Sequence, residues 1–250
     1  MQKIEKSIKG GVIIIGSLRW ENEQNAIQEK TSKNVAIKRA HWRDTNLDLE
    51  NEERHKLPIK YGRCSSTRRC TYTMVFSNLA LEKESHGLVI PYKKEIDFNN
   101  YVNFEQQALL LADVEGISKG NNKLLKEWGC IGLYVNPKSN HINKIKSNWE
   151  ILKLIDNNYN KESKQYRIED DLLLEKDYTL SSDCLIETGL DFLFFTYIKP
   201  QHRNSEINVF PTSQEIADEI NRSGYKTYFE ENRKCGIITF EDEEIKRYLI

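Results

Sequence analysis

The sequence lacks any hydrophobic run long enough to cross a bilayer. Its apolar blocks, such as residues 12–15 and 190–195, are far shorter than the ~20 residues that a membrane-spanning helix needs. Residues 1–10 are too polar to contain the apolar centre of a secretory signal. We therefore expect a cytoplasmic protein that does not enter the membrane.

An excess of charge and a pattern of metal ligands are also missing. The 37 Lys and Arg residues balance 38 Asp and Glu residues, so no overall field attracts nucleic acid, and we expect no nucleic-acid partner. The five cysteines are an odd number without a CxxC pair, and the five histidines show neither HxH nor HExxH spacing. These absences argue against a disulfide framework and a structural zinc site, and they predict reduced thiols and no metal.

What is present indicates a folded α+β protein. Short β-branched or alternating segments predict strands at residues 11–15, 35–42, 57–61, 71–77, 87–92 and 130–135. A helical stripe predicts one good helix over residues 104–114, with Asn103 as its cap. We expect a small mixed or antiparallel, barrel-like sheet with few helices in residues 1–140.

The second half of the chain has a different composition. Residues 141–187 are polar and predict a connector that contains one amphipathic stretch at 149–155. Residues 188–250 predict a smaller βαβα unit packed on the first domain, with strands at 190–198 and 237–240. Thr212 and Glu215 have the spacing of a capping box and open a helix that Gly224 closes, and Asp242 can cap a final helix.

A turn after the first strand is the first candidate site. Gly16-Ser17-Leu18 follows the strand at 11–15, and a glycine there allows backbone N–H groups to face a ligand carboxylate, carbonyl or phosphate. The alternative is a tight turn that ends a core strand. A second candidate is Glu115, whose apolar neighbours can raise its pKa toward the range of a general base, the alternative being an exposed acid in the last helical turn.

A strand that ends in Gly-Ser-Leu, with a later Glu-Gly at a helix end, resembles the gamma-glutamylcyclotransferase-like family. The resemblance covers roughly the first half of the chain, residues 1–140, and includes Trp20 after the turn. It implies a lyase or transferase in which the α-amine of a glutamyl or related aminoacyl compound attacks its own γ-carbonyl, with no metal or organic cofactor. Glu115 then matches the catalytic base, and Gly16, Ser17 and Leu18 match the substrate-binding turn.

A basic, hydroxyl-rich stretch supports a different function. Further substrate-binding candidates in or near it are Arg43, Tyr61, Arg63, Ser65 and Arg68. Arginine forks and hydroxyl groups suit a phosphate or carboxylate, so the alternative to an enzyme is a non-catalytic binder of a nucleotide or other anionic small-molecule signal. A solvated basic loop explains the same residues. A protein-interaction component also remains open, because the aromatic-rich tail suits an interface.

Overall fold

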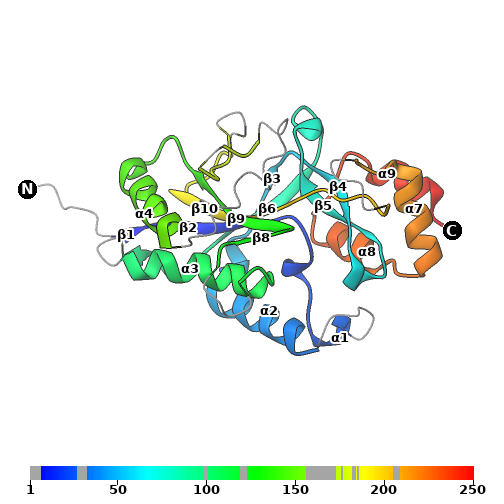
Figure 1. Cartoon of the computed structure of the whole chain (residues 1–250), viewed down its shortest axis with the longest axis horizontal. Coiled ribbons are helices and arrows are strands. Elements are labelled where there is room, and N and C mark those ends of the chain that lie inside the picture. The colour runs from blue at the N-terminus through cyan, green and yellow to red at the C-terminus, as the bar shows by residue number, and fades with distance from the viewer. Residues whose placement is uncertain are drawn as a thin grey trace, which may run out of the picture. The chain divides into compact units, whose positions relative to one another are not determined.

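The structure is a computed structural model that describes residues 7–26, 33–97, 101–118, 123–155, 173–175, 177–181, 184, 186–204 and 209–250. Its helices and strands give an α+β protein, as predicted (Figure 1). The described strands form one six-stranded sheet in the order β3-β6-β2-β10-β9-β8 and two two-stranded sheets, β1-β7 and β4-β5. The large sheet is mixed, because β10 runs parallel to β2 whereas β8 and β9 are antiparallel. In the described part of the chain, no helix combines the length and the apolar character that a membrane span requires.

The chain divides into two compact units, each made of three stretches. Unit 1 comprises residues 1–13, 44–53 and 89–197, and unit 2 comprises residues 14–43, 54–88 and 198–250. Unit 1 contains all or most of the following elements: β1 (Ser7–Ile8), β2 (Gly10–Ile14), β7 (Ile96–Asp97), α3 (Tyr101–Val114), β8 (Leu125–Lys126), β9 (Gly129–Val135), α4 (Ile142–Ile155) and β10 (Phe192–Ile198). β6 (His86–Pro91) begins in unit 2 and ends in unit 1.

An aromatic cluster forms the core of unit 1. Phe104 of α3 lies 5.2 Å from Phe192 and 5.0 Å from Phe194 between ring centroids, and Trp149 of α4 lies 6.1 Å from Phe194. Residues two apart on a strand share a face, so Phe192 and Phe194 direct both rings toward the helices. All four rings are buried, and aromatic side chains contribute large apolar areas to a core.

Unit 2 contains the hairpin and most of the C-terminal helices. Its elements are the 3-10 helix η1 (Ser17–Arg19), α1 (Glu23–Ala26), α2 (Lys33–Asn46), β3 (Glu53–Lys56), β4 (Ile59–Cys64), η3 (Ser66–Arg68), β5 (Tyr72–Phe76), α7 (Ser213–Ser223), α8 (Thr227–Lys234) and α9 (Asp242–Tyr248). β4 and β5 pair antiparallel, α7 packs against α9, and α8 packs against η1 (Figure 1). The predicted capping box of α7 is confirmed, with Thr212 and Glu215 bonded reciprocally and Gly224 in the left-handed region.

The largest local error of the sequence analysis concerns α2. Residues 35–42 were expected to form a strand, but they lie inside this 14-residue helix. Val35 and Ile37, whose β-branched side chains favoured a strand, are 40% and 41% exposed, whereas Ala36 and Trp42 are buried. The buried Ala36 and Arg43 lie seven residues apart, which is two turns of a helix, so both face the same side. Tertiary burial therefore overrides local propensity here.

Three smaller predictions also need correction. Asn103 lies inside α3, which begins at Tyr101, so it is not the cap of that helix. The expected strand at residues 237–240 is reduced to one isolated bridge between Ile238 and His86, because the chain turns into α9 immediately afterwards. The amphipathic stretch predicted at residues 149–155 is part of a longer helix, α4, whose buried Trp149 and Leu152 give it a packed face.

Candidate functional site

The turn after β2 places a serine above a buried carboxylate in unit 2. Ser17 opens η1, and the backbone N–H groups of Trp20 and Glu21 both donate to its carbonyl oxygen, at 3.1 and 2.7 Å. This one-turn spacing brings the two side chains to the same side of the backbone. The Ser17 hydroxyl donates to Oε2 of Glu21 at 2.9 Å.

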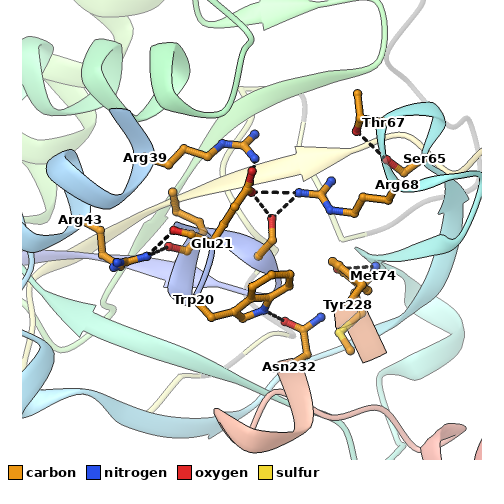
Figure 2. Close-up of polar contacts among 12 residues, drawn as sticks. Trp20, Glu21, Arg39, Arg43, Ser65, Thr67, Arg68, Met74, Tyr228 and Asn232 are labelled. Carbon is orange, nitrogen blue, oxygen red and sulfur yellow. Dashed lines mark hydrogen bonds and ion pairs between the residues drawn. The ribbon is translucent and has the colours of Figure 1, made fainter. Parts of the chain in front are cut away.

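Helix α2 supplies two arginines to this turn. Arg43 is buried and donates to the carbonyl oxygens of Leu18, at 3.2 Å, and Glu21, at 3.0 Å. Arg39, one helical turn earlier, forms an ion pair with Oε2 of Glu21. Arg43 therefore holds the backbone of the turn, while Arg39 faces its carboxylate (Figure 2).

The loop between β4 and β5 supplies a third arginine. Arg68 hydrogen-bonds to the Ser17 hydroxyl and lies 3.1 Å from Oε2 of Glu21. Its guanidinium carbon lies 5.5 Å from the centre of the Tyr228 ring, a cation–π distance. Figure 2 shows Arg39, Arg68 and Glu21 converging from α2, the loop and the turn. We call Ser17, Glu21, Arg39 and Arg68 the arginine cluster.

Burial makes the charges of the arginine cluster strong. The Glu21 side chain has 0% exposure, and each arginine side chain is 11% exposed. Burial alone would raise the pKa of Glu21, but the two arginines and Ser17 outweigh it and hold that pKa below its ordinary value. One ionised carboxylate thus faces two guanidinium groups, and these four side chains sum to a charge of about +1.

The two oxygens of this carboxylate differ sharply. Ser17, Arg39 and Arg68 all contact Oε2, whereas Oε1 is buried and receives no hydrogen bond from any described residue. A buried carboxylate oxygen without a donor is costly, because it has lost water without replacement. Oε1 is therefore a vacant acceptor within the arginine cluster.

Helix α8 supports the turn with rings and one amide. The Tyr228 hydroxyl accepts from the Met74 N–H at 3.1 Å, and its ring lies edge-on to Trp20 at 6.2 Å. The Trp20 indole N–H donates to Asn232 at 2.8 Å. A Cβ on Gly16 would lie 2.8 Å from the Tyr228 hydroxyl, so glycine is required here by close packing, its φ of −170° being open to any residue.

The predicted site residues have different outcomes. The structure brings Ser17 and Arg68 into direct contact and places Gly16, Leu18 and Arg43 in or under the same turn. In contrast, other predicted residues of the basic stretch lie outside the cluster. Arg63 donates to the Lys199 carbonyl oxygen at 3.0 Å, and Ser65 pairs with the Thr67 hydroxyl at 3.1 Å.

Glu115 and Tyr61 also lie outside the arginine cluster. Glu115 is half-buried just after α3, in unit 1, and its N–H donates to the Leu111 carbonyl oxygen at 3.0 Å. Tyr61 is buried in β4, where its backbone N–H donates to Oε2 of Glu241 at 3.3 Å. Burial, together with nearby carboxylates, raises the pKa of the Tyr61 phenol well above its ordinary value.

Glu241 belongs to a second buried ion pair in unit 2. Its Oε1 lies 3.3 Å from Nζ of Lys60, and that Nζ lies 4.8 Å from the centre of the Phe210 ring. Burial raises the pKa of Glu241, and the single lysine does not reverse this effect. The neighbouring Asp242 carboxyl also has a raised pKa, again through burial. We call Lys60 and Glu241 the lysine pair.

Sequence reasoning missed two parts of the site, Glu21 and Tyr228. Glu21 falls in residues 21–34, for which the sequence predicts a loop or a weak helix, and Tyr228 falls in a segment without a predicted helix. Arg39 belongs to the basic group that the sequence offers for an anion, but it was expected on a strand. The i, i+4 spacing of Ser17 with Glu21, and of Arg39 with Arg43, was the available signal. It is weak in isolation because such spacings are common among polar residues.

Unit 1 has a cavity of its own, with a volume of about 580 Å³. Lys146 and Glu175 line it as exposed charges, with Thr179, Leu180 and Ser181 deeper in the wall. Exposed charges are screened by water and bind ions weakly. The arginine cluster is therefore the better candidate for recognition of a charged ligand.

Comparison with known proteins adds no relative: no family model, curated protein or solved structure matches this chain. Within the described residues, no group of three or more His, Cys, Asp or Glu side chains is arranged to hold a metal ion.

Proposed function

We propose that unit 2 binds a small anionic molecule at the arginine cluster. The observation that carries this proposal is the convergence of two buried guanidinium groups on one carboxylate beside the Gly16–Leu18 turn. A carboxylate or phosphate matches the fork geometry of the two arginines. Because the arginines are only 11% exposed, binding involves a local opening of the cluster.

The vacant oxygen of Glu21 narrows the ligand class. Oε1 accepts a hydrogen bond, so it suits a ligand that carries a donor next to its anionic group. An α-amino acid has both groups, with the carboxylate for Arg39 and Arg68 and the ammonium for Glu21. We therefore favour a glutamyl or other aminoacyl compound over a nucleotide, which offers phosphates without an adjacent ammonium.

Titration calorimetry with L-glutamate and glutarate tests both parts of this proposal. Glutarate carries more negative charge but lacks the ammonium, so tighter binding of L-glutamate supports the role of Glu21. Arg68→Ala should weaken L-glutamate binding at least tenfold, because a lost charged hydrogen bond costs about 1.5–3 kcal/mol.

Arg63→Ala is the matched control for Arg68→Ala. Arg63 lies on the preceding strand and donates to the Lys199 backbone, outside the arginine cluster, so its loss should change affinity less than twofold. An equal loss in both variants, or no heat from wild-type protein with L-glutamate, glutarate, inorganic phosphate or ATP, would contradict the anion-binding proposal.

A cyclotransferase-like reaction extends this proposal to catalysis. By the resemblance, N–H groups of the Gly16–Leu18 turn stabilise an oxyanion on a glutamyl γ-carbonyl. In the proposed reaction, the α-amine attacks that carbonyl, the γ-amide bond breaks, and the departing amine takes up a proton. The products are 5-oxoproline and an amine. The role of base is proposed for Glu115, which lies in unit 1, on the resemblance alone.

The release of 5-oxoproline from γ-glutamyl amides, measured by mass spectrometry, tests the reaction separately from binding. Glu115→Gln should abolish release and leave L-glutamate affinity unchanged, since the amide keeps the shape of the side chain and removes the base. Equal turnover in this variant and the wild type ends the assignment of Glu115. A cytoplasmic location remains part of the proposal and agrees with five free thiols.

A further inference from the structure

Two cysteines flank the loop that carries Arg68. Cys64 is the last residue of β4, Cys70 lies two residues before β5, and both are partly exposed. The Cys64 thiol donates to the Cys70 carbonyl oxygen at 3.3 Å. The Cys70 N–H in turn donates to the Ser65 carbonyl oxygen at 2.9 Å, so the backbone already holds the two ends of the loop together.

The Cys64 sulfur lies beside the backbone of Cys70. Burial raises the pKa of Cys64 to about 11, with a smaller contribution from Cys70, so we expect the pair to react more readily at alkaline pH. Cys130 and Cys184 are buried in unit 1, and Cys235 follows α8 at a different point of unit 2. Of the five cysteines, Cys64 and Cys70 are therefore the two that we expect to bond to each other, because they lie next to each other across this loop.

We propose that Cys64 and Cys70 form a reversible disulfide and are a site of oxidative modification that controls Arg68. The oxidant is a peroxide. One sulfur attacks hydrogen peroxide and becomes a sulfenic acid, with release of one water. The second sulfur then displaces the hydroxyl group as another water, so two thiols and one peroxide give one disulfide and two waters.

The new bond changes the backbone beside Arg68. It removes the S–H that donates to the Cys70 carbonyl oxygen and draws the two sulfur atoms to about 2 Å from each other. Arg69 and Cys70 both have positive φ, 53° and 65°, a strained conformation for residues with a Cβ. When the new bond moves Cys70, we expect the backbone dihedral angles of Arg69 and Cys70 to change. Arg68 immediately precedes these two residues, so its position changes with them. We expect Arg68 to leave Ser17 and Glu21 in the oxidised protein.

Peptide mapping by mass spectrometry tests the disulfide without reference to any ligand. Full-length reduced protein is treated with hydrogen peroxide, alkylated and digested with trypsin, which cuts between the two cysteines and leaves the bridge as a linked pair of peptides. We expect a Cys64–Cys70 link that dithiothreitol reverses, is retained in Cys235→Ser and is lost in Cys70→Ser. Alkylation of both thiols after peroxide treatment, or linkage of either one mainly to another cysteine, overturns the proposal.

The effect on Arg68 rests on the proposed anion-binding function and is measured with L-glutamate. Affinity should fall about tenfold on oxidation of the wild type and stay constant in Cys70→Ser. Unchanged affinity in protein that demonstrably contains the disulfide overturns control of Arg68. If reduced wild-type protein binds no L-glutamate, the proposed function fails, while the peptide map still decides whether the disulfide forms.

Discussion

Two buried carboxylates of unit 2, Glu21 and Glu241, have pKa values shifted in opposite directions. Glu21 faces two arginines and a serine, and its pKa is held below the ordinary value. Glu241 faces one lysine, and burial raises its pKa above that value. The difference shows that burial alone does not decide whether a carboxylate remains charged, because the number and geometry of its donors must exceed the cost of desolvation.

The same difference separates a recognition site from a structural contact. In the arginine cluster, two guanidinium groups meet one carboxylate, and one oxygen of that carboxylate has no donor among the described residues. In the lysine pair, each side contributes one charge, and the Lys60 ammonium also contacts aromatic rings. The lysine pair joins α9 to β4 and has no charge left to bind a ligand.

The largest expected difference between the two sites is the loss of stability when each carboxylate is replaced by a neutral amide. Glu21→Gln should destabilise the protein by about 3 kcal/mol at pH 7, because it removes the charge that two largely buried guanidinium groups share. Glu241→Gln should cost less than Glu21→Gln, because burial already makes the ionised form of Glu241 less favourable and only one lysine loses its paired carboxylate. Urea denaturation of both variants measures this, and equal losses would remove the distinction between the clusters.

A smaller loss of stability is expected when the close packing between Gly16 and Tyr228 is disturbed. Gly16→Ala should cost about 1–3 kcal/mol through overpacking, because its Cβ would lie 2.8 Å from the Tyr228 hydroxyl. Gly189→Ala is the control, since nothing lies within 4 Å of a Cβ there. Adding Tyr228→Phe should recover part of the loss, and strictly additive effects of the two changes in thermal unfolding would exclude the proposed contact.

The smallest effect is the pH dependence, which should have opposite signs at the two carboxylates. Since the folded pKa of Glu21 lies below its ordinary 4.5, its ionisation stabilises the fold above about pH 4.5, and this contribution is lost as the pH falls through the folded value. Since the folded pKa of Glu241 lies above 4.5, its ionisation penalises the fold at higher pH, and the penalty disappears as the pH falls to about 4.5.

Urea titrations from pH 7 to pH 3 check these signs. The stability difference between wild type and Glu21→Gln should shrink below pH 4.5. The difference between wild type and Glu241→Gln should change mainly between pH 7 and pH 4.5. The same trend in both variants would contradict the pKa directions on which the comparison depends.

Local sequence chemistry determined several features of this protein. A β-branched run that ends in Gly-Ser-Leu predicted the strand and turn of β2 and η1, and Thr212 with Glu215 predicted the start of α7. These predictions succeed because the interactions that define them span only a few residues. The α+β class followed from the same local patterns.

Only the tertiary structure decided which charged groups meet. Arg68 is 47 residues from Glu21 along the chain, and no local rule selects it over Arg63, which lies nearer in sequence but donates to the Lys199 backbone instead. Arg39 reaches Glu21 because residues 35–42 are helical, and that depends on which face of α2 is buried. Long-range packing sets both choices, since desolvation and charge pairing act through space and carry no signature in adjacent residues.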